Sequence, residues 1–322
     1  MKEKINLKFV DFSRMFDLNN FPIFTQLKER YDLIISNEPD FLIYGPFGKE
    51  HLSYDCIKIF YTGENVVPDF NICDYGIGFH YINFGDRYCR YPHYVGYNGY
   101  DLALVKHLDN ETLLESKTNF CNFIYTNGNC VHPFRDKFFD RLSNYKKVDS
   151  GGRHRNNIGG PIGDRYNNFS DSKYNFQCNY KFSIACENST TPGYTTEKLL
   201  QAFAAKTIPI YWGDPCVANE FNENAFINCH KYNTMDEIIE VVKRIDNNDD
   251  LFIKMITEPC FSPMQLDNQK QLRLNLENFM YNIFDQSLIQ GCRTEKYVRG
   301  RISKESQRAA FLAKGILDVI KV

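Results

Sequence analysis

Short apolar runs bounded by Asn, Pro or Gly alternate with helical segments along this chain, and this order constrains the fold more than any other feature. The first apolar runs are, in chain order, INLKFVDF, DLIISN, DFLIYGPFG, IKIFYTG and ICDYGIGFHYINFG. Between the first two lies PIFTQLKERY, which suits a helix with Pro22 in its first turn and Ile23, Leu27 and Tyr31 on one face. Strands with an interposed helix predict a parallel sheet with both faces covered.

A second αβ series follows the less regular stretch 91–117, which suits an inter-domain connection. Its elements are FCNFIYTN, HPFRDKFFDRLSNY, KVDSGG, YKFSIACEN, TTEKLLQAFAAK, TIPIYWG, FINCHKY and TMDEIIEVVKRID. The loop over 151–168 is too polar to pack. Two successive series favour an α/β fold of two Rossmann-like domains with a ligand between them, at the carboxyl ends of the strands. We expect domains over residues 1–115 and 116–300, then a helical tail over 301–322.

The composition excludes two classes of protein. With 322 residues, 43% of them hydrophobic, the chain can bury a large core, so wholesale disorder is excluded. Its 38 basic and 40 acidic residues nearly cancel, so nucleic acid is not an expected partner.

The sequence also predicts where the chain resides. No apolar run approaches the roughly 18 residues of a membrane span, and MKEKINLKFVDFSR has no secretory apolar region. The eleven cysteines are scattered without a C-x-x-C pair, which favours reduced thiols and a cytoplasmic location. The final QRAAFLAKGILDVIKV predicts a helix that packs on the domain surface or crosses between domains. Peripheral membrane contact is the alternative, but the segment lacks the basic polar face that such contact favours.

Metal and nucleotide motifs of several common kinds are missing. The chain has no Asp-x-Asp, no G-x-x-x-x-G-K-[ST] and no G-x-G-x-x-G, and its histidines show no paired ligand spacing. We therefore predict no bound metal and no cofactor, and leave open a loose stimulation by a divalent ion.

The strongest local signal is YKFSIACENSTTPGYTTEKLLQAFAAKTIPIYWGDP, residues 180–215. It predicts a strand, a loop and a helix that opens at Thr195 or Thr196, whose hydroxyl can cap the free N–H groups. Such a helix start favours an anion, and a bound phosphate would explain Lys198, which the helix dipole alone repels. The alternative is that Asn188 and Thr195 only close a turn and cap a helix, with Lys198 solvated.

The run ENSTTPGYTTEK followed by AAKTIPIYWG resembles the signature of the α-1,3-fucosyltransferases, which use GDP-fucose. FYTGENVVPDFNICDYGIGFHYINFGDRYCRYPHY (60–94) is similar to the family's acceptor-domain segment, and VDSGGRHRNN (148–157) to its donor-loop segment. The resemblance implies a GT-B architecture, in which residues 1–115 form an acceptor-side domain, residues 116–300 bind the GDP-sugar, and the two face a central cleft.

The resemblance also implies roles for individual residues. Glu64 matches the general base, and Arg155 matches the donor-loop arginine that contacts the GDP diphosphate. The other matched donor-site residues are Asn188, Tyr194, Glu197 and Lys198. The lysine is expected on the phosphates, and the glutamate on the guanosine ribose or the sugar. Cys186 and Thr195 depart from the family's usual aromatic and valine, which affects packing and removes no charged group.

The expected reaction asks for these residue types. A carboxylate must take the proton from the acceptor hydroxyl, a role for Glu64, which would otherwise be an ordinary solvated turn residue. The leaving diphosphate gathers negative charge, which Arg155, Lys198 and the helix N-terminus can stabilise. Without a donor, Arg153 and Arg155 belong to a flexible basic loop.

The segment FGDRYCRYPHY interleaves arginines and tyrosines. Such a pattern can bind single-stranded nucleic acid, but the neutral charge balance favours a packed segment at a domain edge. Aromatic faces near the cleft can also stack on an acceptor sugar, and the sequence does not single out which.

We therefore expect an inverting fucosyltransferase that moves L-fucose from GDP-fucose to a glycan hydroxyl, O3 of an N-acetylglucosamine unit. Two alternatives stay open. One is a GT-B enzyme with another nucleotide-sugar or acceptor, and the other is a catalytically silent glycan-binding protein of the same fold. The choice between O3 and O4, the natural acceptor and the oligomeric state are not set by the sequence.

Overall fold

The computed structural model describes residues 2–14, 16–97, 99–105, 109–128, 132–163, 169–294 and 298–320. The chain folds into two compact units. The N-terminal unit comprises residues 1–91 and 270–322, and the second unit comprises residues 92–269.

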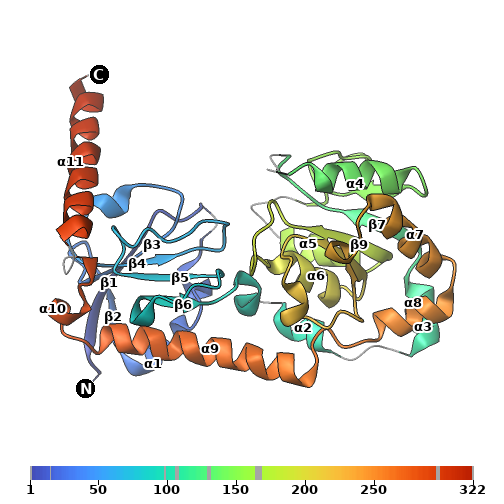
Figure 1. Cartoon of the computed structure of the whole chain (residues 1–322), viewed down its shortest axis with the longest axis horizontal. Coiled ribbons are helices and arrows are strands. Elements are labelled where there is room, and N and C mark those ends of the chain that lie inside the picture. Colours follow the sequence, from blue (N-terminus) through green and yellow to red (C-terminus); the bar gives the residue numbers. More distant parts are fainter. Residues whose placement is uncertain are drawn as a thin grey trace. The chain divides into compact units, whose positions relative to one another are not determined.

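The N-terminal unit is built on a six-stranded sheet in the order β2-β1-β3-β4-β5-β6, and every pair of neighbours is parallel (Figure 1). Its strands are β1 (Lys4–Val10), β2 (Asp32–Ile35), β3 (Phe41–Tyr44), β4 (Ile57–Tyr61), β5 (Tyr75–Gly78) and β6 (Tyr88–Arg90). The central strands β3 and β5 are buried along their whole length, as expected for a parallel sheet covered on both faces. The parallel sheet predicted from the apolar runs is confirmed.

Helices and 3-10 turns connect or follow these strands. They are η1 (Leu18–Asn20), α1 (Phe24–Arg30), η2 (Glu50–Ser53), η3 (Gly85–Arg87), α10 (Leu288–Gly291) and α11 (Val298–Ile320). The first predicted helix is present, but Pro22 lies outside it because Ile23 takes a left-handed conformation (φ 59°) and serves as the N-cap. The predicted C-terminal helix is also present, and Lys304 of α11 pairs with Asp55 (3.2 Å).

The segment after residue 270 completes the N-terminal unit. Asp74, fully buried at the start of β5, accepts hydrogen bonds from the backbone N–H groups of Arg293 (2.7 Å) and Thr294 (2.8 Å). Near α1, the Tyr31 hydroxyl donates to Asp285 (2.5 Å) at the end of α9 (Pro263–Phe284). These polar contacts tie the segment 285–294 to the N-terminal unit.

The second unit has a five-stranded parallel sheet in the order β11-β10-β9-β7-β8. The strands are β7 (Asn119–Phe123), β8 (Val148–Ser150), β9 (Tyr180–Cys186), β10 (Ile208–Trp212) and β11 (Ile227–Asn228). Its remaining elements are η4 (His93–Gly96), α2 (Tyr100–Leu104), α3 (Asn110–Ser116), α4 (Phe134–Ser143), α5 (Phe169–Gln177), α6 (Glu197–Ala204), η5 (Val217–Asn219), η6 (Cys229–Lys231), α7 (Met235–Asp246) and α8 (Asp249–Ile256). Apolar side chains of these strands pack with α4, α7 and α8 into one core. Residues 151–163 form no helix or strand, as predicted, and residues 164–168 lie outside the described part.

The boundaries of the units differ from the predicted 115/116 and 300/301. Residues 92–115 belong to the second unit, because α2 packs on α6 and Lys206 donates to the carbonyls of Leu102 (2.9 Å) and Val105 (2.7 Å). The second boundary lies inside α9, at residues 269/270, and not at residue 300. The returning helix could not be located from the sequence because its partners are more than two hundred residues away in the chain.

The arginine- and tyrosine-rich segment is packed, as predicted. Tyr88, Tyr91 and Tyr94 are buried. Arg87, also buried, donates to the backbone carbonyls of Phe70, Cys73 and Asp74. These side chains are therefore committed to the fold.

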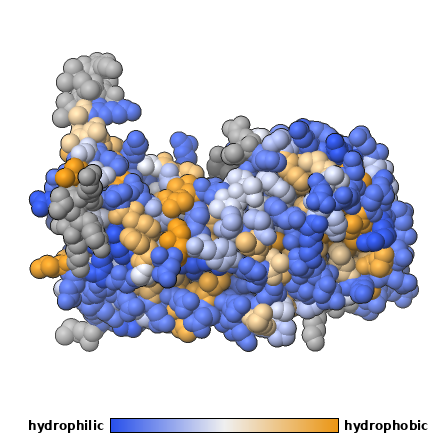
Figure 2. All heavy atoms as spheres, in the orientation of Figure 1, coloured by the Kyte–Doolittle hydropathy of each residue, from blue (hydrophilic) through white to orange (hydrophobic). Residues whose placement is uncertain are grey.

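The surface is mainly polar on the face shown in Figure 2, with smaller, scattered hydrophobic areas. Among the described residues, no helix combines the length and the apolar character needed to cross a membrane.

Candidate active site

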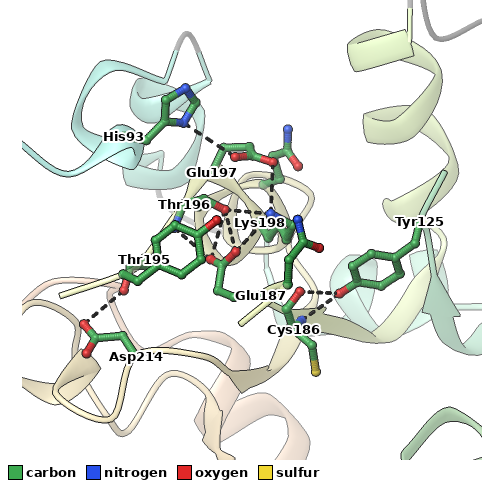
Figure 3. A network of polar contacts seen from close by, with 12 residues as sticks. His93, Tyr125, Cys186, Glu187, Thr195, Thr196, Glu197, Lys198 and Asp214 are labelled. Carbon is green, nitrogen blue, oxygen red and sulfur yellow. Dashed lines mark hydrogen bonds and ion pairs between the residues drawn. The ribbon is translucent and has the colours of Figure 1, made fainter. Parts of the chain in front are cut away.

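The centre of the candidate site is Glu187, the first residue after β9. Its backbone N–H donates to the Trp212 carbonyl at the end of β10 (2.7 Å), which holds the residue at the carboxyl edge of the sheet. Its side chain is fully buried. The carboxylate accepts hydrogen bonds from the Thr196 N–H (2.7 Å), the Thr196 hydroxyl (2.8 and 2.9 Å) and the Lys198 ammonium (2.9 Å) (Figure 3). A buried carboxylate needs such partners to offset its lost hydration.

The start of α6 depends on this carboxylate. Thr196 is the N-cap residue, as predicted, but its hydroxyl does not cap the helix. The hydroxyl instead donates to Glu187 and accepts from Lys198 (2.8 Å), so the prediction of a threonine cap is wrong. The ionised carboxylate is the stronger acceptor, and it lies on the preceding strand.

Lys198 is an enclosed cation. Its side chain is 17% exposed, and its ammonium lies 2.9 Å from Glu187 and 3.6 Å from Glu197. Burial alone would lower the pKa of Lys198, but the charges of the two carboxylates outweigh burial and raise it well above the ordinary value. Lys198 is therefore positively charged across the physiological range. Its position at a helix N-terminus is explained by these carboxylates without a phosphate.

Glu197 begins α6 beside Lys198, with its side chain partly exposed. His93 of η4 approaches it, with Nδ1 3.5 Å from a carboxylate oxygen. Burial would raise the pKa of Glu197, but the positive charge of Lys198 and the neighbouring His93 hold it well below the ordinary value. Glu197 is therefore a fixed anion that still reaches the surface, where it can accept hydrogen bonds from ligand hydroxyls.

The loop from β9 to α6 is fixed by Asp214, which follows β10. Asp214 accepts hydrogen bonds from the Gly193 N–H (2.8 Å) and the Thr195 hydroxyl (3.3 Å). Gly193 has φ 87°, a conformation that disfavours residues with a Cβ atom. Tyr194 lies between them and is buried, and its carbonyl accepts from the Tyr211 hydroxyl (3.3 Å). The predicted strand–loop–helix is confirmed, with its loop held from β10.

Asn188 contacts a group of residues that follow β7. Its side-chain oxygen accepts a hydrogen bond from Arg135 of α4 (3.3 Å). The fully buried Arg135 side chain also donates to the Asn127 carbonyl (3.1 Å) and lies over the Tyr125 ring (4.4 Å). The Tyr125 hydroxyl in turn accepts from the Cys186 N–H (2.7 Å), so these residues brace the end of β9.

Arg155 lies in the loop after β8. Its interactions are with α4: it pairs with Asp140 and with Asp136 (3.4 Å), and its guanidinium lies over the Phe139 ring (5.6 Å). Its backbone is left-handed (φ 55°), which is uncommon for a residue with a side chain. Arg155 and Lys198 thus follow strands of one parallel sheet and leave it at the same edge, but each is paired with carboxylates of its own.

Glu64 belongs to the N-terminal unit, directly after β4. The Thr62 hydroxyl accepts from the Glu64 N–H (2.9 Å), and the Glu64 carbonyl accepts from the Val66 N–H (2.7 Å). These bonds form a tight turn that leaves the Glu64 side chain exposed at the carboxyl edge of the first sheet. An exposed carboxylate at that edge can accept a proton from a bound hydroxyl.

Sequence reasoning missed Glu187, Arg135 and Lys173. Lys173 of α5 donates to Gln201 (2.5 Å), and burial lowers its pKa to about 8. It lines, with Lys198, a polar cavity of about 10 Å³, room for about one water molecule. A glutamate immediately after a buried strand was the available signal for Glu187, since such a residue requires a partner.

Metal ligands do not gather in the described residues. Within the ranges given above, no three side chains of His, Cys, Asp or Glu converge as a metal site would require. The cysteines of the described part are free thiols.

Two units, each with a parallel sheet and polar residues at its carboxyl edge, fit the GT-B class of glycosyltransferase folds. A solved Anabaena structure in complex with UDP-glucose shares this fold, with a TM-score of 0.52 over 88% of this chain and 100% of that chain. At 8% identity, the likeness concerns the fold alone.

Comparison with known proteins identifies the family. A model of the α-(1,3)-fucosyltransferase FucT N-terminal domain matches residues 7–97, and the C-terminal model of glycosyltransferase family 10 (fucosyltransferase) matches residues 114–257. A crystal structure of an α1,3-fucosyltransferase with GDP-fucose aligns with a TM-score of 0.71 at 27% identity, over 89% of this chain and 93% of that one. The chain belongs to the α-1,3-fucosyltransferase family.

Two curated relatives illustrate the range of the family. The α-(1,3)-fucosyltransferase FucT of Helicobacter pylori is 32% identical over 280 residues, which cover 75% of this chain and 56% of the relative. GDP-fucose protein O-fucosyltransferase 3 of Xenopus tropicalis is 32% identical over 138 residues, 41% of this chain and 29% of the relative. The chain therefore spans about half the length of the first relative and matches less than a third of the second.

Proposed function

We propose that this chain is an inverting fucosyltransferase that moves L-fucose from GDP-fucose to a glycan hydroxyl, O3 of an N-acetylglucosamine unit. The observation that carries the proposal is the network of Glu187, Thr196 and Lys198 at the start of α6, in a chain of the α-1,3-fucosyltransferase family. The likeness to a solved relative with GDP-fucose supports the choice of donor.

The second unit would bind the donor. Lys198 supplies a fixed positive charge for the diphosphate, because its carboxylate partners keep it protonated and hold it in place. Arg155 supplies a bidentate contact, and it exchanges its pairing with Asp136 and Asp140 for the phosphates. Asn188, Tyr194 and Glu197 complete the donor site, with the Glu197 carboxylate on ribose or sugar hydroxyls.

The N-terminal unit would supply the base. The Glu64 carboxylate takes the proton of the acceptor hydroxyl as that oxygen bonds to the anomeric carbon. The bond from the anomeric carbon to the phosphate oxygen breaks on the opposite face, and GDP leaves with the electron pair. The anomeric configuration is inverted, and the charge that builds on GDP is stabilised by Lys198 and Arg155.

The decisive assay measures fucosyl transfer from GDP-fucose to N-acetyllactosamine-type acceptors. We expect a fucosylated product, and NMR identifies whether the fucose is linked to O3 or O4. We also expect EDTA to leave the rate of transfer unchanged, because the positive charges that stabilise the diphosphate come from the protein. Glu64→Gln is expected to abolish turnover and leave GDP affinity unchanged. The proposal would be rejected if the protein transferred fucose to none of a broad set of acceptors and also failed to hydrolyse the donor.

Two further measurements separate the alternatives. Isothermal titration with GDP and UDP tests the donor, since binding of UDP as tight as that of GDP would indicate another nucleotide-sugar. Glycan binding without turnover in the wild type would indicate a silent binding protein. The partial identity to a protein O-fucosyltransferase favours one second acceptor class, so serine- and threonine-containing peptides belong in the acceptor set.

A further inference from the structure

The carboxyl edge of the first sheet carries a second chemistry-bearing residue close to the Glu64 turn. β4 and β5 are parallel neighbours, and the Thr62 N–H continues the pairing by donating to the Ile77 carbonyl (3.3 Å). The turn that holds Glu64 and the segment that begins at Phe79 therefore leave the sheet at adjacent positions. His80 and Tyr81 are the next residues of that segment.

His80 is held in a defined position. The residue is only 8% exposed, its ring stacks on Phe79 (centroids 4.0 Å apart), and its carbonyl accepts from the Tyr88 hydroxyl (3.0 Å). Burial and the positive charge of Arg90 lower the pKa of His80 below its ordinary value. The ring is therefore neutral at pH 7 and carries one N–H.

The position of that proton follows from the surroundings of the two ring nitrogens. Nδ1 is sealed from solvent and has no hydrogen-bond partner among the described residues, whereas Nε2 is not sealed in this way. A buried N–H without an acceptor is costlier than a buried lone pair without a donor. The proton therefore resides on Nε2, and His80 presents an oriented N–H donor at the edge of the sheet.

Tyr81 places an aromatic surface next to this donor. Its side chain is 50% exposed, directly after the buried segment 72–80 and before the exposed residues 83–86. The Arg90 guanidinium lies 4.1 Å from the ring centroid and is itself anchored by a hydrogen bond to the Phe79 carbonyl (2.8 Å). An exposed ring held in one orientation can pack against the apolar face of a pyranose.

We propose that His80 and Tyr81 form an acceptor-sugar subsite, in which the His80 Nε2–H donates to a sugar oxygen and the Tyr81 ring packs against the sugar. The subsite selects pyranoses that carry an oxygen where the His80 Nε2–H can donate to it, and it presents them beside Glu64. The role of this subsite in the reaction rests on the proposed fucosyl transfer. Its ability to bind a sugar rests only on the contacts of His80 and Tyr81 described above.

Saturation-transfer NMR tests sugar binding without turnover, using N-acetyllactosamine, lactose and chitobiose with the GDP-bound protein. His80→Gln places an amide nitrogen near the position of Nε2, whereas His80→Asn places one near Nδ1. We expect the signal to survive His80→Gln and Tyr81→Phe, and to fall at least fivefold in His80→Asn and Tyr81→Ser. Ile289→Ser is the matched control, since this residue is 88% exposed on α10, whose Gly291 lies against Ile57 at the start of β4, the end opposite Glu64.

The outcomes are distinguishable. Equal signals in all variants, or no sugar signal in the wild type, would overturn the subsite. A wild type that binds sugar through His80 and Tyr81 but transfers no fucose would leave the subsite standing and overturn the proposed function.

Kinetics give the second measurement. We expect His80→Asn to raise the acceptor KM about tenfold, the effect of one lost hydrogen bond, with His80→Gln within about threefold of wild type. The GDP Kd and the thermal midpoint should stay unchanged. A loss of GDP affinity or of thermal stability that accounts for the KM effect would assign His80 a structural role instead.

Discussion

Lys198 and Arg155 follow strands of the same sheet, but their surroundings differ. Lys198 is enclosed, with a buried carboxylate at 2.9 Å and a second at 3.6 Å. Arg155 is a third exposed, pairs with two aspartates on α4 and has a left-handed backbone. The first cation is held by the interior whether or not a ligand is present, and the second must exchange its partners to bind one. The positive charge is therefore fixed by the fold at Lys198, whereas at Arg155 it becomes available to a ligand only if the pairs with Asp136 and Asp140 break.

The largest expected effect is on stability, when the buried pair of Glu187 and Lys198 is broken. Glu187→Gln leaves Lys198 without its closest carboxylate, and we expect a loss of about 3 kcal/mol in the free energy of unfolding. Urea denaturation followed by the fluorescence of Trp212, the single tryptophan, reports on this sheet directly. Glu223→Gln, which breaks the more exposed pair with Lys231 (2.8 Å), is the control and should cost less than about 1 kcal/mol. Equal losses would show that Glu187 has no special role.

Replacement of Lys198 tests the binding role of the enclosed cation. Lys198→Met keeps the length of the side chain and removes its charge, and we expect the GDP Kd to rise about a hundredfold, the cost of a charged contact. Isothermal titration measures it, with circular dichroism to verify the fold. An unchanged Kd in a folded variant would confine Lys198 to the ionic network.

Arg155 should contribute less to binding because its gain is reduced by the lost pairing with Asp136 and Asp140. Arg155→Ala is expected to raise the GDP Kd about tenfold and to change stability by less than about 1 kcal/mol. Arg141→Ala, which removes another exposed α4 pair (with Asp236, 3.0 Å), should leave the Kd unchanged. If both variants changed the GDP Kd equally, GDP would respond only to the net charge around α4, and Arg155 would not contact it.

Lys173 sharpens the comparison, since it lies near Lys198 and its pKa is lowered to about 8. The unfolded chain binds this proton more tightly, so the cost to stability is complete below about pH 8 and fades as pH rises towards 10.5. Between pH 8 and 9.5, wild type should gain on the order of 1 kcal/mol over Lys173→Met. Urea titrations at the two pH values test it; parallel pH dependences would contradict the shift.

The sheets could be predicted because buried parallel strands leave continuous apolar runs in the sequence, as in FLIY and IPIYW. The extent of each unit could not. Asp74 gives no local sign that it binds the backbone of Arg293 and Thr294, and the spacing of α2 gives none that it packs on α6. Contacts between residues far apart in the chain leave no periodic pattern in the sequence, so they could not be predicted from it.

The sequence predicted several residues of the candidate site but not the contacts that hold them. Glu197 and Lys198 do lie at a helix start after a loop, where the sequence puts them. The phosphate argument for Lys198 omitted Glu187, because burial of a carboxylate is decided by packing and not by its neighbours in the chain. The cap assigned to Thr196 failed for the same reason.

The hydrogen bonds to Asp74 affect the order in which the two units can fold during synthesis. Residues 92–269 are contiguous, so their sheet can form while the ribosome is still at work. In the strands that precede residue 92, one oxygen of the buried Asp74 carboxylate accepts from the Lys58 N–H, but the other lacks its partners until Arg293 and Thr294 emerge. The N-terminal unit can therefore be completed only after the segment that follows α9 has been synthesised.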